Sequence, residues 1–472
     1  MPVIPFDANL LHNERAVNQF LLHCQEKYEG DSTYQFISFC QKIEPIDPLA
    51  VLDKFIQKNQ IHFYWENPRK QEAIAAIGTT HILKINSGDR FLQSKHFIQD
   101  CLRKTLLTGS VDLPNNLPFL FSSFTFFDSP QIGDSPFPCA TVFLPQFQVF
   151  KNQNNCYLII NISLKKTFNI SEIFKIKHQI KNIYFANDSN TFKYKNSSKD
   201  QLNINYQNYR AEFTAAVTSA LEAIENKKYS KIVLSNALEV FSVNPFRLIE
   251  SLNNLRKNHG DCYVFSTSNG KGDNFIGASP ERLISIKNRH LVTDALAGSA
   301  PRGKTDAEDD FFAKKLLKSE KERREHQAVS EFIMQRLGEL GIEPERSSLQ
   351  LLQLSNIQHL WTTISAQLPE NIHPIDIVAQ LHPTPAVAGV PREIVLPQIR
   401  HYETFDRALY AAPLGWFSYQ GNSEFIVGIR SALIKDNKAR LYAGAGIVAG
   451  SDPNKELAEI ELKFQALLRS LL

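Results

Sequence analysis

The chain has 472 residues, enough to bury one large core or two to three smaller ones. Its hydrophobic fraction of 43% and charged fraction of 21% are those of an ordinary globular protein. The formal net charge of +3 is small for this length, and the densest basic stretch, KSEKERREH at 318–326, alternates its cations with glutamates. That alternation predicts a solvated helix face, so we do not expect nucleic-acid binding.

The six cysteines lie far apart and form no C-x-x-C pair: Cys24, Cys40, Cys101, Cys139, Cys156 and Cys262. This spacing argues against structural zinc and indicates reduced, buried thiols in a reducing compartment. No apolar run approaches the ~20 residues that span a bilayer. The first residues lack the apolar centre of a signal peptide and the Arg- and Ser-rich bias of a transit peptide. We therefore expect a cytoplasmic protein with no membrane partner.

Residues 1–205 contain short runs of β character and no motif that we can match. The clearest runs are FLFSSFTFF at 119–127, ATVFLPQFQVF at 140–150 and CYLIINISL at 156–164. An Asn- and Ser-rich stretch, NDSNTFKYKNSSKDQLN at 187–203, predicts an exposed connector. We find no internal repeat.

Residues 206–472 have a different pattern, with longer helices and more regular strands. Helices are predicted over 209–229, over about 306–340 and over 452–472, and strands over 231–241, 262–268, 275–286, 290–298, 358–368, 425–434 and 439–448. Strands and helices occur in blocks, with short connections between adjacent strands. This order favours antiparallel sheets flanked by helices, an α+β fold, over a regular βαβ array.

One segment, GSAPRGKT at 298–305, fits the phosphate-binding pattern G-x-x-x-x-G-K-[ST]. Three features weaken that interpretation. The acidic run DAEDD at 306–310 would repel a triphosphate, Pro301 removes one N–H from the cradle, and no apolar strand ends in an aspartate that would hold magnesium. A nucleotide-binding protein that uses Lys304 remains a distant alternative.

Two helices carry glutamates at i, i+3 spacing, which places both carboxylates of a pair on one side of the helix. The pairs are Glu322 with Glu325 and Glu456 with Glu459, and apolar residues follow Glu325 and Glu456 at helical spacing. Inward carboxylates are costly unless they are paired or bind a cation. Two such helices facing each other would suit Mg²⁺. The same spacing also occurs on solvated faces of Glu-rich helices, so both interpretations stay open.

An ordered series of segments from residue 230 onward is more specific than any single motif. The segments are SKIVLSN (230–236), FIGASPERL (275–283), DALAGSAPRG (294–303), EHQAV (325–329), LSNIQHL (354–360), LHPTPAVAGVP (381–391), GWFSYQG (415–421), IRSAL (429–433) and LYAGAGIVAGSDP (441–453). Together they resemble the chorismate-utilising enzymes, and among these most closely the isochorismate synthases.

The resemblance implies a large layered domain of antiparallel sheets with helices outside. Residues 1–205 would form the N-terminal part of the same fold, and residues 206–472 the chorismate-binding catalytic region. It also implies Mg²⁺-dependent conversion of chorismate to isochorismate, in which water adds at ring carbon 2 and the hydroxyl at carbon 4 leaves. That chemistry needs a base, an acid and a clamp for two carboxylates.

Within this resemblance, Lys231 matches the general base and Glu281 the general acid. Taken alone, Lys231 is an ordinary charge at a strand start, and Glu281 a turn-capping carboxylate after Pro280. A lysine base must be neutral, which requires desolvation or nearby positive charge. A glutamate acid needs a raised pKa. A magnesium ion close to this glutamate would lower its pKa, so we expect the acid and the metal at opposite ends of the substrate.

The remaining site residues are also implied by the resemblance. Glu325 and Glu459 would hold Mg²⁺, with Glu322 and Glu456 beside them and acting through water. Arg430 and Tyr410 would hold the side-chain carboxylate of chorismate, although Arg430 and His359 taken alone are a surface charge and a core histidine. The full substrate-binding set is Ala295, Leu296, Gly298, Ser299, His359, Ala386, Tyr410, Arg430, Gly444, Gly446 and Lys463.

Two positions bear on which reaction the chain performs. Ala295-Leu296 stands where anthranilate synthases carry Pro-Ile and aminodeoxychorismate synthases a nucleophilic lysine, and this apolar pair suits water. Ala386 and Val387 stand where salicylate synthases carry a hydroxyl, which favours stopping at isochorismate. Ser299 replaces the usual threonine. A salicylate synthase, and a relative that binds chorismate without turnover, stay as alternatives.

No partner subunit and no glutamine-amidotransferase segment is evident, so a monomer is one expectation and the oligomeric state stays open. The sequence equally leaves open whether the product would enter a menaquinone- or phylloquinone-type quinone, a siderophore or salicylate.

Overall fold

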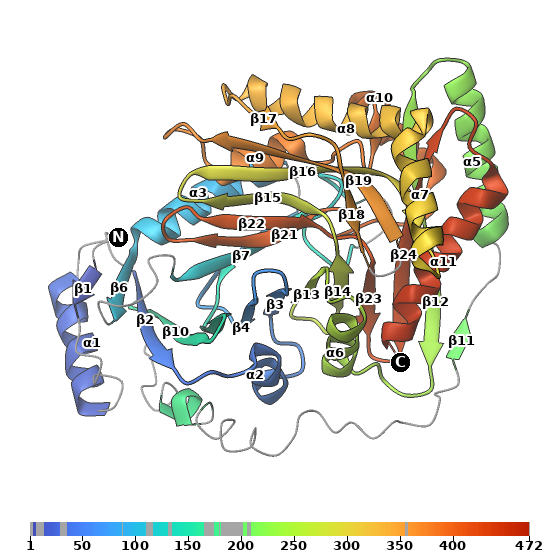
Figure 1. Cartoon of the computed structure of the whole chain (residues 1–472). Coiled ribbons are helices and arrows are strands. Elements are labelled where there is room, and N and C mark those ends of the chain that lie inside the picture. Colours follow the sequence, from blue (N-terminus) through green and yellow to red (C-terminus); the bar gives the residue numbers. More distant parts are fainter. Residues whose placement is uncertain are drawn as a thin grey trace.

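Two β-sheets lie face to face at the centre of this computed structural model, and helices cover their outer sides (Figure 1). The structure describes residues 3–5, 14–28, 35–86, 88–109, 117–130, 135–164, 174–178, 180, 202–204, 209–354 and 357–471. The predicted connector at 187–203 lies outside these residues except for its last two, and so do residues 355–356 of the LSNIQHL segment.

The larger sheet holds fourteen of the described strands, and its pairs are antiparallel except where β6 runs parallel to β1 and β2. In spatial order its strands are β1 (Val3–Pro5), β6 (Thr105–Gly109), β2 (Phe36–Ile43), β10 (Asn155–Ser163), β9 (Phe147–Asn152), β4 (Glu72–Ile77), β3 (His62–Asn67), β13 (Tyr263–Ser268), β14 (Asn274–Ser279), β23 (Ser431–Lys435), β24 (Lys438–Val448), β12 (Lys231–Ser242) and β11 (Leu202–Ile204), with β20 (Gly389–Val390) paired to β12.

The smaller sheet holds ten of the described strands, all in antiparallel pairs. In spatial order these are β17 (Glu345–Arg346), β19 (Ile357–Gln367), β16 (His290–Pro301), β15 (Arg282–Lys287), β22 (Ser423–Val427), β21 (Pro413–Ser418), β7 (Phe119–Phe124), β8 (Ala140–Leu144) and β5 (His81–Ile85), with β18 (Gln350–Gln353) paired to β19. Both sheets join early and late parts of the chain, because β3 pairs with β13 and β7 with β21.

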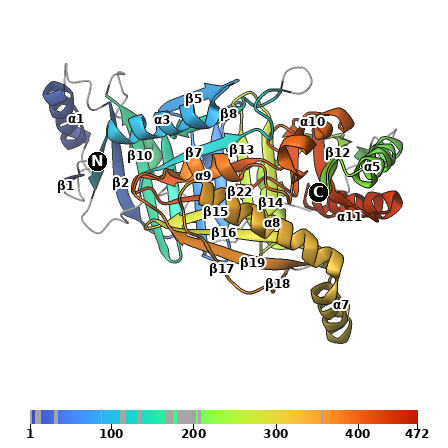
Figure 2. The same ribbon diagram turned by 90° about the horizontal axis from the view of Figure 1, so that it is seen from above.

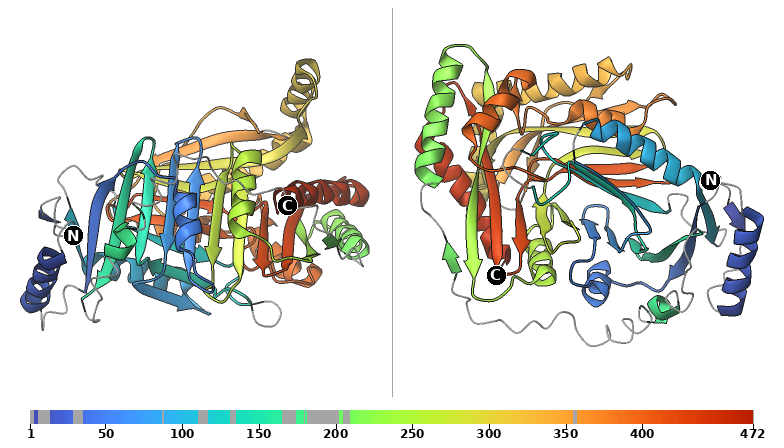
Figure 3. Two further views of the ribbon diagram at one scale, coloured as in Figure 1. Left: turned by 90° about the horizontal axis from the view of Figure 1, so that it is seen from below. Right: turned by 180° about the vertical axis from the view of Figure 1, so that it is seen from behind.

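The helices occupy the outer sides of the two sheets (Figures 1 and 3). Four contact the smaller sheet: α3 (Arg90–Arg103), α7 (Asp306–Lys318), α8 (Glu320–Glu339) and α9 (Pro374–Leu381). Six others are α1 (Glu14–Tyr28), α2 (Pro48–Phe55), α5 (Tyr209–Glu225), α6 (Leu248–Asn258), α10 (Arg392–Tyr402) and α11 (Pro453–Leu471), of which α5 and α11 contact β12 and β24. Helix α7 projects from the body (Figure 2). The predicted α+β class is confirmed.

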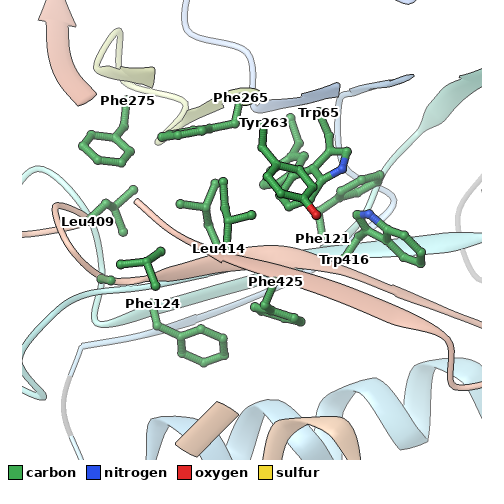
Figure 4. Close-up of a cluster of buried hydrophobic side chains, with 14 of the residues drawn as sticks. Trp65, Phe121, Phe124, Tyr263, Phe265, Phe275, Leu409, Leu414, Trp416 and Phe425 are labelled. Atoms are coloured by element: carbon green, nitrogen blue, oxygen red, sulfur yellow. The ribbon is translucent and has the colours of Figure 1, made fainter. Parts of the chain in front are cut away.

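Aromatic side chains fill the space between the sheets (Figure 4). The Phe63 ring on β3 lies 4.8 Å, centroid to centroid, from Phe121 on β7, so this contact crosses from one sheet to the other. Such a pair contributes roughly 0.5–1.5 kcal/mol beyond its area burial. Phe124 points the other way, toward the helices, with its ring 4.6 Å from Phe91 of α3.

Two of the predicted strands are wrong, because each run is divided into two separate strands. The run 275–286 is two strands, β14 and β15, and the run 425–434 is also two, β22 and β23. In each case one strand lies in the larger sheet and the other in the smaller. Pro280 breaks the first run because it has no N–H for the ladder, and Arg430, with φ 48°, turns the second. Glu281 and Arg430 therefore lie where the chain passes between the sheets.

The predicted helix over 306–340 is also two helices, because Ser319 ends α7 and begins α8 with extended φ and ψ angles. Its hydroxyl accepts a hydrogen bond from the Glu322 N–H at 3.4 Å. The sequence S-E-K-E at 319–322 is a capping-box pattern that the helical periodicity concealed.

All six cysteines are free and buried. Among the described helices, none is long and apolar enough to cross a membrane.

Candidate active site

Lys231 is the first residue of β12 and is only 4% exposed, so it is not an ordinary charge at a strand end. Its Nζ lies 2.6 Å from Glu325 Oε1 on α8. Gly446 on the neighbouring strand β24 leaves room for this contact. A Cβ at Gly446 would lie 3.2 Å from Lys231 Cε and 3.4 Å from Glu325 Oε1.

Glu281 lies at the sheet-to-sheet passage after Pro280 and is 6% exposed. Its backbone is fixed on both sides: its N–H donates to Ser279 Oγ at 3.2 Å, and its carbonyl accepts from the Val427 N–H at 3.1 Å. Burial raises its pKa to about 8, with Lys231 opposing and Asp294 adding to the rise. The carboxyl is therefore protonated at neutral pH and can donate a proton.

The two glutamate pairs extend from α8 and α11 and make different contacts. Glu322 Oε2 accepts from the Ser299 N–H at 3.2 Å, and Glu459 Oε1 lies 2.7 Å from Lys463 Nζ. Gly298 forms a bulge in β16 with φ 78°, and a Cβ there would lie 3.1 Å from Glu322 Oε2. A glycine is therefore required for this approach of α8 to the strand.

The electrostatics of these glutamates differ from one another. The pKa of Glu322 is raised by burial and by Glu325, and that of Glu456 by burial and by Glu459, with a Ser451 hydrogen bond opposing. For Glu325, burial raises the pKa, but the charge and hydrogen bond of Lys231 outweigh it, so the net shift is downward. The cluster thus concentrates negative charge, which nearby lysines and the hydrogen bonds from Ser299 and Ser451 partly offset.

These oxygen donors fit a magnesium ion. Within the described part of the chain, no group of three His, Cys, Asp or Glu side chains is placed so that it could hold a metal ion. Mg²⁺ does not need one, since it usually takes one or two carboxylates, keeps several waters and accepts substrate oxygens. A cation would also relieve the repulsion that raises the pKa values of Glu322 and Glu456.

Arg430 and its neighbours form a second, positively charged part of the site. Arg430 is half-buried, and its Nη1 lies 3.7 Å from Cys262 Sγ. Among the described residues, no carboxylate forms an ion pair with it. Its left-handed φ of 48° is costly for a non-glycine residue, and such strain often marks a functional position. This guanidinium is available to an anionic ligand.

Tyr410 and Lys463 both lie against Gly444 of β24. The Tyr410 ring stacks on Tyr442 at 5.1 Å between centroids, and a Cβ at Gly444 would lie 3.0 Å from the Tyr410 hydroxyl. Lys463 Nζ donates to the Gly444 carbonyl at 2.7 Å, so the lysine bridges β24 and Glu459.

His359 on β19 lies opposite Ser299 in the ladder, and its ring forms a hydrogen bond with the backbone of Gly298. Its Nε2 is buried and has no partner in the structure. Burial, with Arg430 and Lys463 adding to it, lowers the pKa to about 3, so the ring is neutral. An inaccessible, unpaired ring nitrogen is the kind of group that a bound ligand satisfies.

Ala295 and Leu296 are buried on β16, immediately before the Gly298 bulge. Ala386 is half-buried in the segment that leads into β20, and β20 pairs with Lys231 and Ile232 of β12. These three residues lie on segments beside the charged groups, but the structure gives them no polar contact there.

The phosphate-loop alternative finds no support in the geometry. The Gly303 N–H donates to Asp309 Oδ1 at 2.9 Å, and the Lys304 N–H donates to Glu308 Oε2 at 2.9 Å. Carboxylates of α7 therefore already occupy the amides that a phosphate would need. The preceding strand also belongs to an antiparallel sheet.

Three polar residues of this region were missed from the sequence. Asp294 Oδ1 accepts from Arg282 Nη2 and from Trp361 Nε1, both at 2.8 Å, and it influences Glu281. Glu403 and Arg407 form a fully buried ion pair close to β12. Acidic or basic residues inside buried runs, as in TDALAG and ETFDR, are the signal that could have revealed them.

Comparison with known proteins agrees with this geometry. The sequence profile of the family described as chorismate binding enzyme matches residues 19–472. The chain belongs to this family.

The relatives of this family member include isochorismate synthases. It is 28% identical over 467 residues to isochorismate synthase MenF of Bacillus subtilis, covering 97% of this chain and 98% of that protein. It is 38% identical over 270 residues to the salicylate biosynthesis isochorismate synthase of Pseudomonas aeruginosa, covering 56% of this chain and 55% of that protein.

Solved structures share the fold of this family member. The menaquinone-specific isochorismate synthase MenF of Escherichia coli superposes with a TM-score of 0.75 at 24% identity, covering 97% of this chain and 99% of that one. Anthranilate synthase component I of Streptococcus pneumoniae gives 0.67 at 20% identity, covering 84% and 92%. At these identities the likeness extends to the fold.

Proposed function

We propose that the chain is an isochorismate synthase that converts chorismate to isochorismate. The observation that carries this proposal is the arrangement of two buried groups, Lys231 and Glu281, whose charges interact. Lys231 also contacts the cluster of four glutamates, through Glu325. An acid and a base on either side of one ring are what the exchange of a hydroxyl from carbon 4 to carbon 2 requires. The full-length similarity to a named isochorismate synthase supports the same assignment.

In the proposed reaction Lys231 first gives up the proton that it carries in its ion pair with Glu325 and, once neutral, accepts a proton from water as the water oxygen bonds to ring carbon 2. Glu281 donates its proton to the hydroxyl at carbon 4, which leaves as water while the double bonds shift. One water enters and one leaves, so no oxidant or further reactant is needed. The raised pKa of Glu281 keeps its proton available at neutral pH.

We propose that Glu325 and Glu459 hold Mg²⁺, with Glu322 and Glu456 beside them through water. When bound, the ion supplies positive charge for the ring carboxylate of chorismate and fixes its position. The fit rests on the all-oxygen donor set and on the raised pKa values of Glu322 and Glu456. Glu281 senses Lys231 and Asp294 rather than these glutamates, in keeping with the expected separation of acid and metal.

The charged groups around the cluster would hold the two carboxylates of the substrate. Arg430, which lacks a described carboxylate partner, can bind the side-chain carboxylate in bidentate fashion, and in this proposal the Tyr410 hydroxyl binds the same group. Lys463 and the backbone at Gly444 and Gly446 lie toward the ring carboxylate.

The remaining proposed contacts orient the ring between acid and base. His359 Nε2 and the Ser299 hydroxyl would contact ring oxygens, and Ala295, Leu296 and Ala386 would form apolar walls that exclude a second nucleophile. All these side chains come from residues 206–472, and in this proposal residues 1–205 support them as part of the same fold.

The test is incubation of the purified chain with chorismate and Mg²⁺, followed by chromatography. We expect an isochorismate peak that disappears in Lys231→Ala. Salicylate together with pyruvate would instead indicate a salicylate synthase, and binding without consumption of chorismate a non-catalytic relative. Unchanged turnover in Lys231→Ala would refute the assigned base.

The pathway that uses the product stays open. Relatives named for menaquinone, for salicylate and for 2,3-dihydroxybenzoate all match this chain. Coupled assays with candidate downstream enzymes would decide among them.

A further inference from the structure

Glu403 and Arg407 form an ion pair in the interior of the protein. Glu403 caps the C-terminal end of α10, and Arg407 follows four residues later. Arg407 is 0% exposed and Glu403 is 5% exposed. The guanidinium binds the carboxylate through two atoms, with Nε 2.8 Å from Oε2 and Nη2 2.5 Å from Oε1. We call these two residues the buried pair.

The buried pair completes one edge of β12, the strand that begins with Lys231. Strand β24 covers the other edge along almost the whole length of β12, but β20 pairs only with its first two residues. Where β20 ends, Arg407 Nη2 donates to the Val233 carbonyl at 2.8 Å. Glu403 Oε1 then accepts from the Ser235 N–H at 2.8 Å and from the Ser235 hydroxyl at 2.7 Å. Strand β11 covers the far end of the same edge, at residues 240–242, so the two side chains bridge the gap between β20 and β11.

The same guanidinium also contacts two other segments of the proposed site. Arg407 Nη1 donates to the Val387 carbonyl at 2.9 Å, directly after Ala386. Its Cζ lies 5.9 Å from the centre of the Tyr410 ring, and the Arg407 carbonyl accepts from the Tyr410 N–H at 2.7 Å. Strand β12, which carries Lys231, the segment of Ala386, and Tyr410 therefore all contact the buried pair.

Stability alone is a poor reason for such a pair. The cost of removing two charges from water usually offsets their attraction, and apolar residues of similar volume often serve the fold equally well. An apolar pair cannot, however, fix the directions of a carbonyl and an amide on a strand. The planar fork of arginine can, because it presents its donors at set angles.

We propose that Glu403 and Arg407 are positioning residues for the reaction, which hold β12 and the segment around Ala386 so that Lys231 reaches carbon 2 of the ring. This inference rests on the proposed function. Apart from Tyr410, the groups assigned to the substrate carboxylates and the metal lie elsewhere, on β24, α8 and α11 and at Arg430. Loss of the pair should therefore impair turnover much more than binding.

The test compares the double variant Glu403→Leu/Arg407→Met with the wild type. Removing both charges avoids leaving one of them buried without a partner. We expect a folded protein whose kcat falls about 100-fold, the scale of a misplacement near 1 Å. We expect KM to change less than about threefold, since uniform binding is retained. Hydrogen exchange at the amides of 231–235 and 384–390 should become faster.

A matched control is the partly buried pair Arg256–Asp47, whose charged atoms lie 2.9 Å apart. Arg256→Met/Asp47→Asn removes that pair while Asn keeps the cap of α2. We expect wild-type kcat and wild-type exchange at 231–235. If the double variant of the buried pair does not fold, Arg407→Lys replaces it, and a loss of about tenfold in kcat is then expected, because one ammonium cannot reach all three carbonyl and carboxylate partners.

A folded variant with kcat within threefold of wild type would overturn the inference. Unchanged exchange at 231–235 relative to the control would overturn it as well, whatever the activity. A wild-type protein that does not convert chorismate would refute the proposed function instead, and the exchange measurement would still decide whether the pair orders β12.

Discussion

Two buried glutamates at different parts of the candidate site, Glu281 and Glu325, have pKa values shifted in opposite directions. Burial raises the pKa of Glu281 to about 8, and the opposing charge of Lys231 does not cancel this effect. Glu325 is also affected by burial, yet contact with Lys231 brings its pKa below the ordinary value. The difference shows that hydrogen-bonded lysines, rather than burial alone, decide which glutamate carries a proton and which a charge.

This contrast assigns the two parts different tasks. A protonated carboxyl can give a proton to a leaving hydroxyl, and ionised carboxylates can hold a cation. Asp294 increases the difference, since it acts on Glu281 from the smaller sheet, where Arg282 and Trp361 hold it. Substitution of Glu281 or of Glu325 removes one side of this contrast and leaves the other.

The largest effect is expected for Glu281→Gln, which keeps the shape of the acid but removes its proton. General acid catalysis contributes about 10²–10⁴-fold, so kcat should fall on the order of 1,000-fold while chorismate still binds. Steady-state kinetics and equilibrium binding measure the two quantities. An equally large loss in binding would mean that Glu281 holds the substrate instead.

The next effect concerns the metal part of the site. Glu325→Gln should raise the Mg²⁺ concentration needed for half-maximal rate at least about 100-fold, and Glu322→Gln about tenfold, because the loss of a residue that supports the metal ligands usually costs 10–100-fold in metal affinity. Calorimetric Mg²⁺ titration provides a measurement independent of turnover. Equal effects of the two variants would refute the assignment of Glu325 as the direct ligand.

A smaller effect is expected for Arg430→Lys, which retains the charge but loses the bidentate geometry. We expect KM for chorismate to rise about 10–30-fold with kcat nearly unchanged, the value of one charged hydrogen bond. Arg336→Lys, at a half-buried arginine of α8 that pairs with Glu393, is the control and should leave KM unchanged. An effect on kcat alone would contradict the proposed carboxylate clamp.

The pH dependence tests the acid directly. Because Glu281 must be protonated to act, kcat/KM should fall as pH rises through about 8, by about tenfold per unit above that value. The same sign holds for stability: the folded state binds this proton and the unfolded state releases it above the ordinary pKa, so this contribution is lost as pH rises toward 8. A profile that is flat from pH 7 to 9.5 would contradict the raised pKa.

The smallest effect is expected at the sequence that resembles a phosphate loop. Lys304→Ala should leave kcat and KM within about twofold, as is usual for an exposed surface change, and ATP should not shift the melting temperature of either protein. A melting shift with ATP that is lost in Lys304→Ala would revive the nucleotide alternative.

Sequence patterns alone predicted the elements of this site better than their connections. The i, i+3 glutamate pairs and the strand of Lys231 could be read from the sequence, since both depend on local periodicity. The passage of the chain between two sheets at Glu281 and Arg430 could not, because two short apolar runs on either side of a break look like one strand. The break at Ser319 was missed for the same reason, although its capping pattern is present.

The chemical roles came from the family resemblance and not from local patterns. A lysine at a strand start and a glutamate after a proline have no special meaning until the fold buries them together. The buried pair Glu403–Arg407 was missed because its partners, Val233, Ser235 and Val387, are distant in sequence and contribute mainly backbone groups. Backbone contacts leave no trace in side-chain patterns.

The most direct test of the central claim is conversion of chorismate in H₂¹⁸O with Mg²⁺, analysed by mass spectrometry. If water adds at carbon 2 between Lys231 and Glu281, the wild-type protein should form isochorismate that carries one ¹⁸O atom, and neither Lys231→Ala nor Glu281→Gln should form it at a comparable rate. Unlabelled isochorismate, or labelled product formed equally fast by both variants, would contradict the claim.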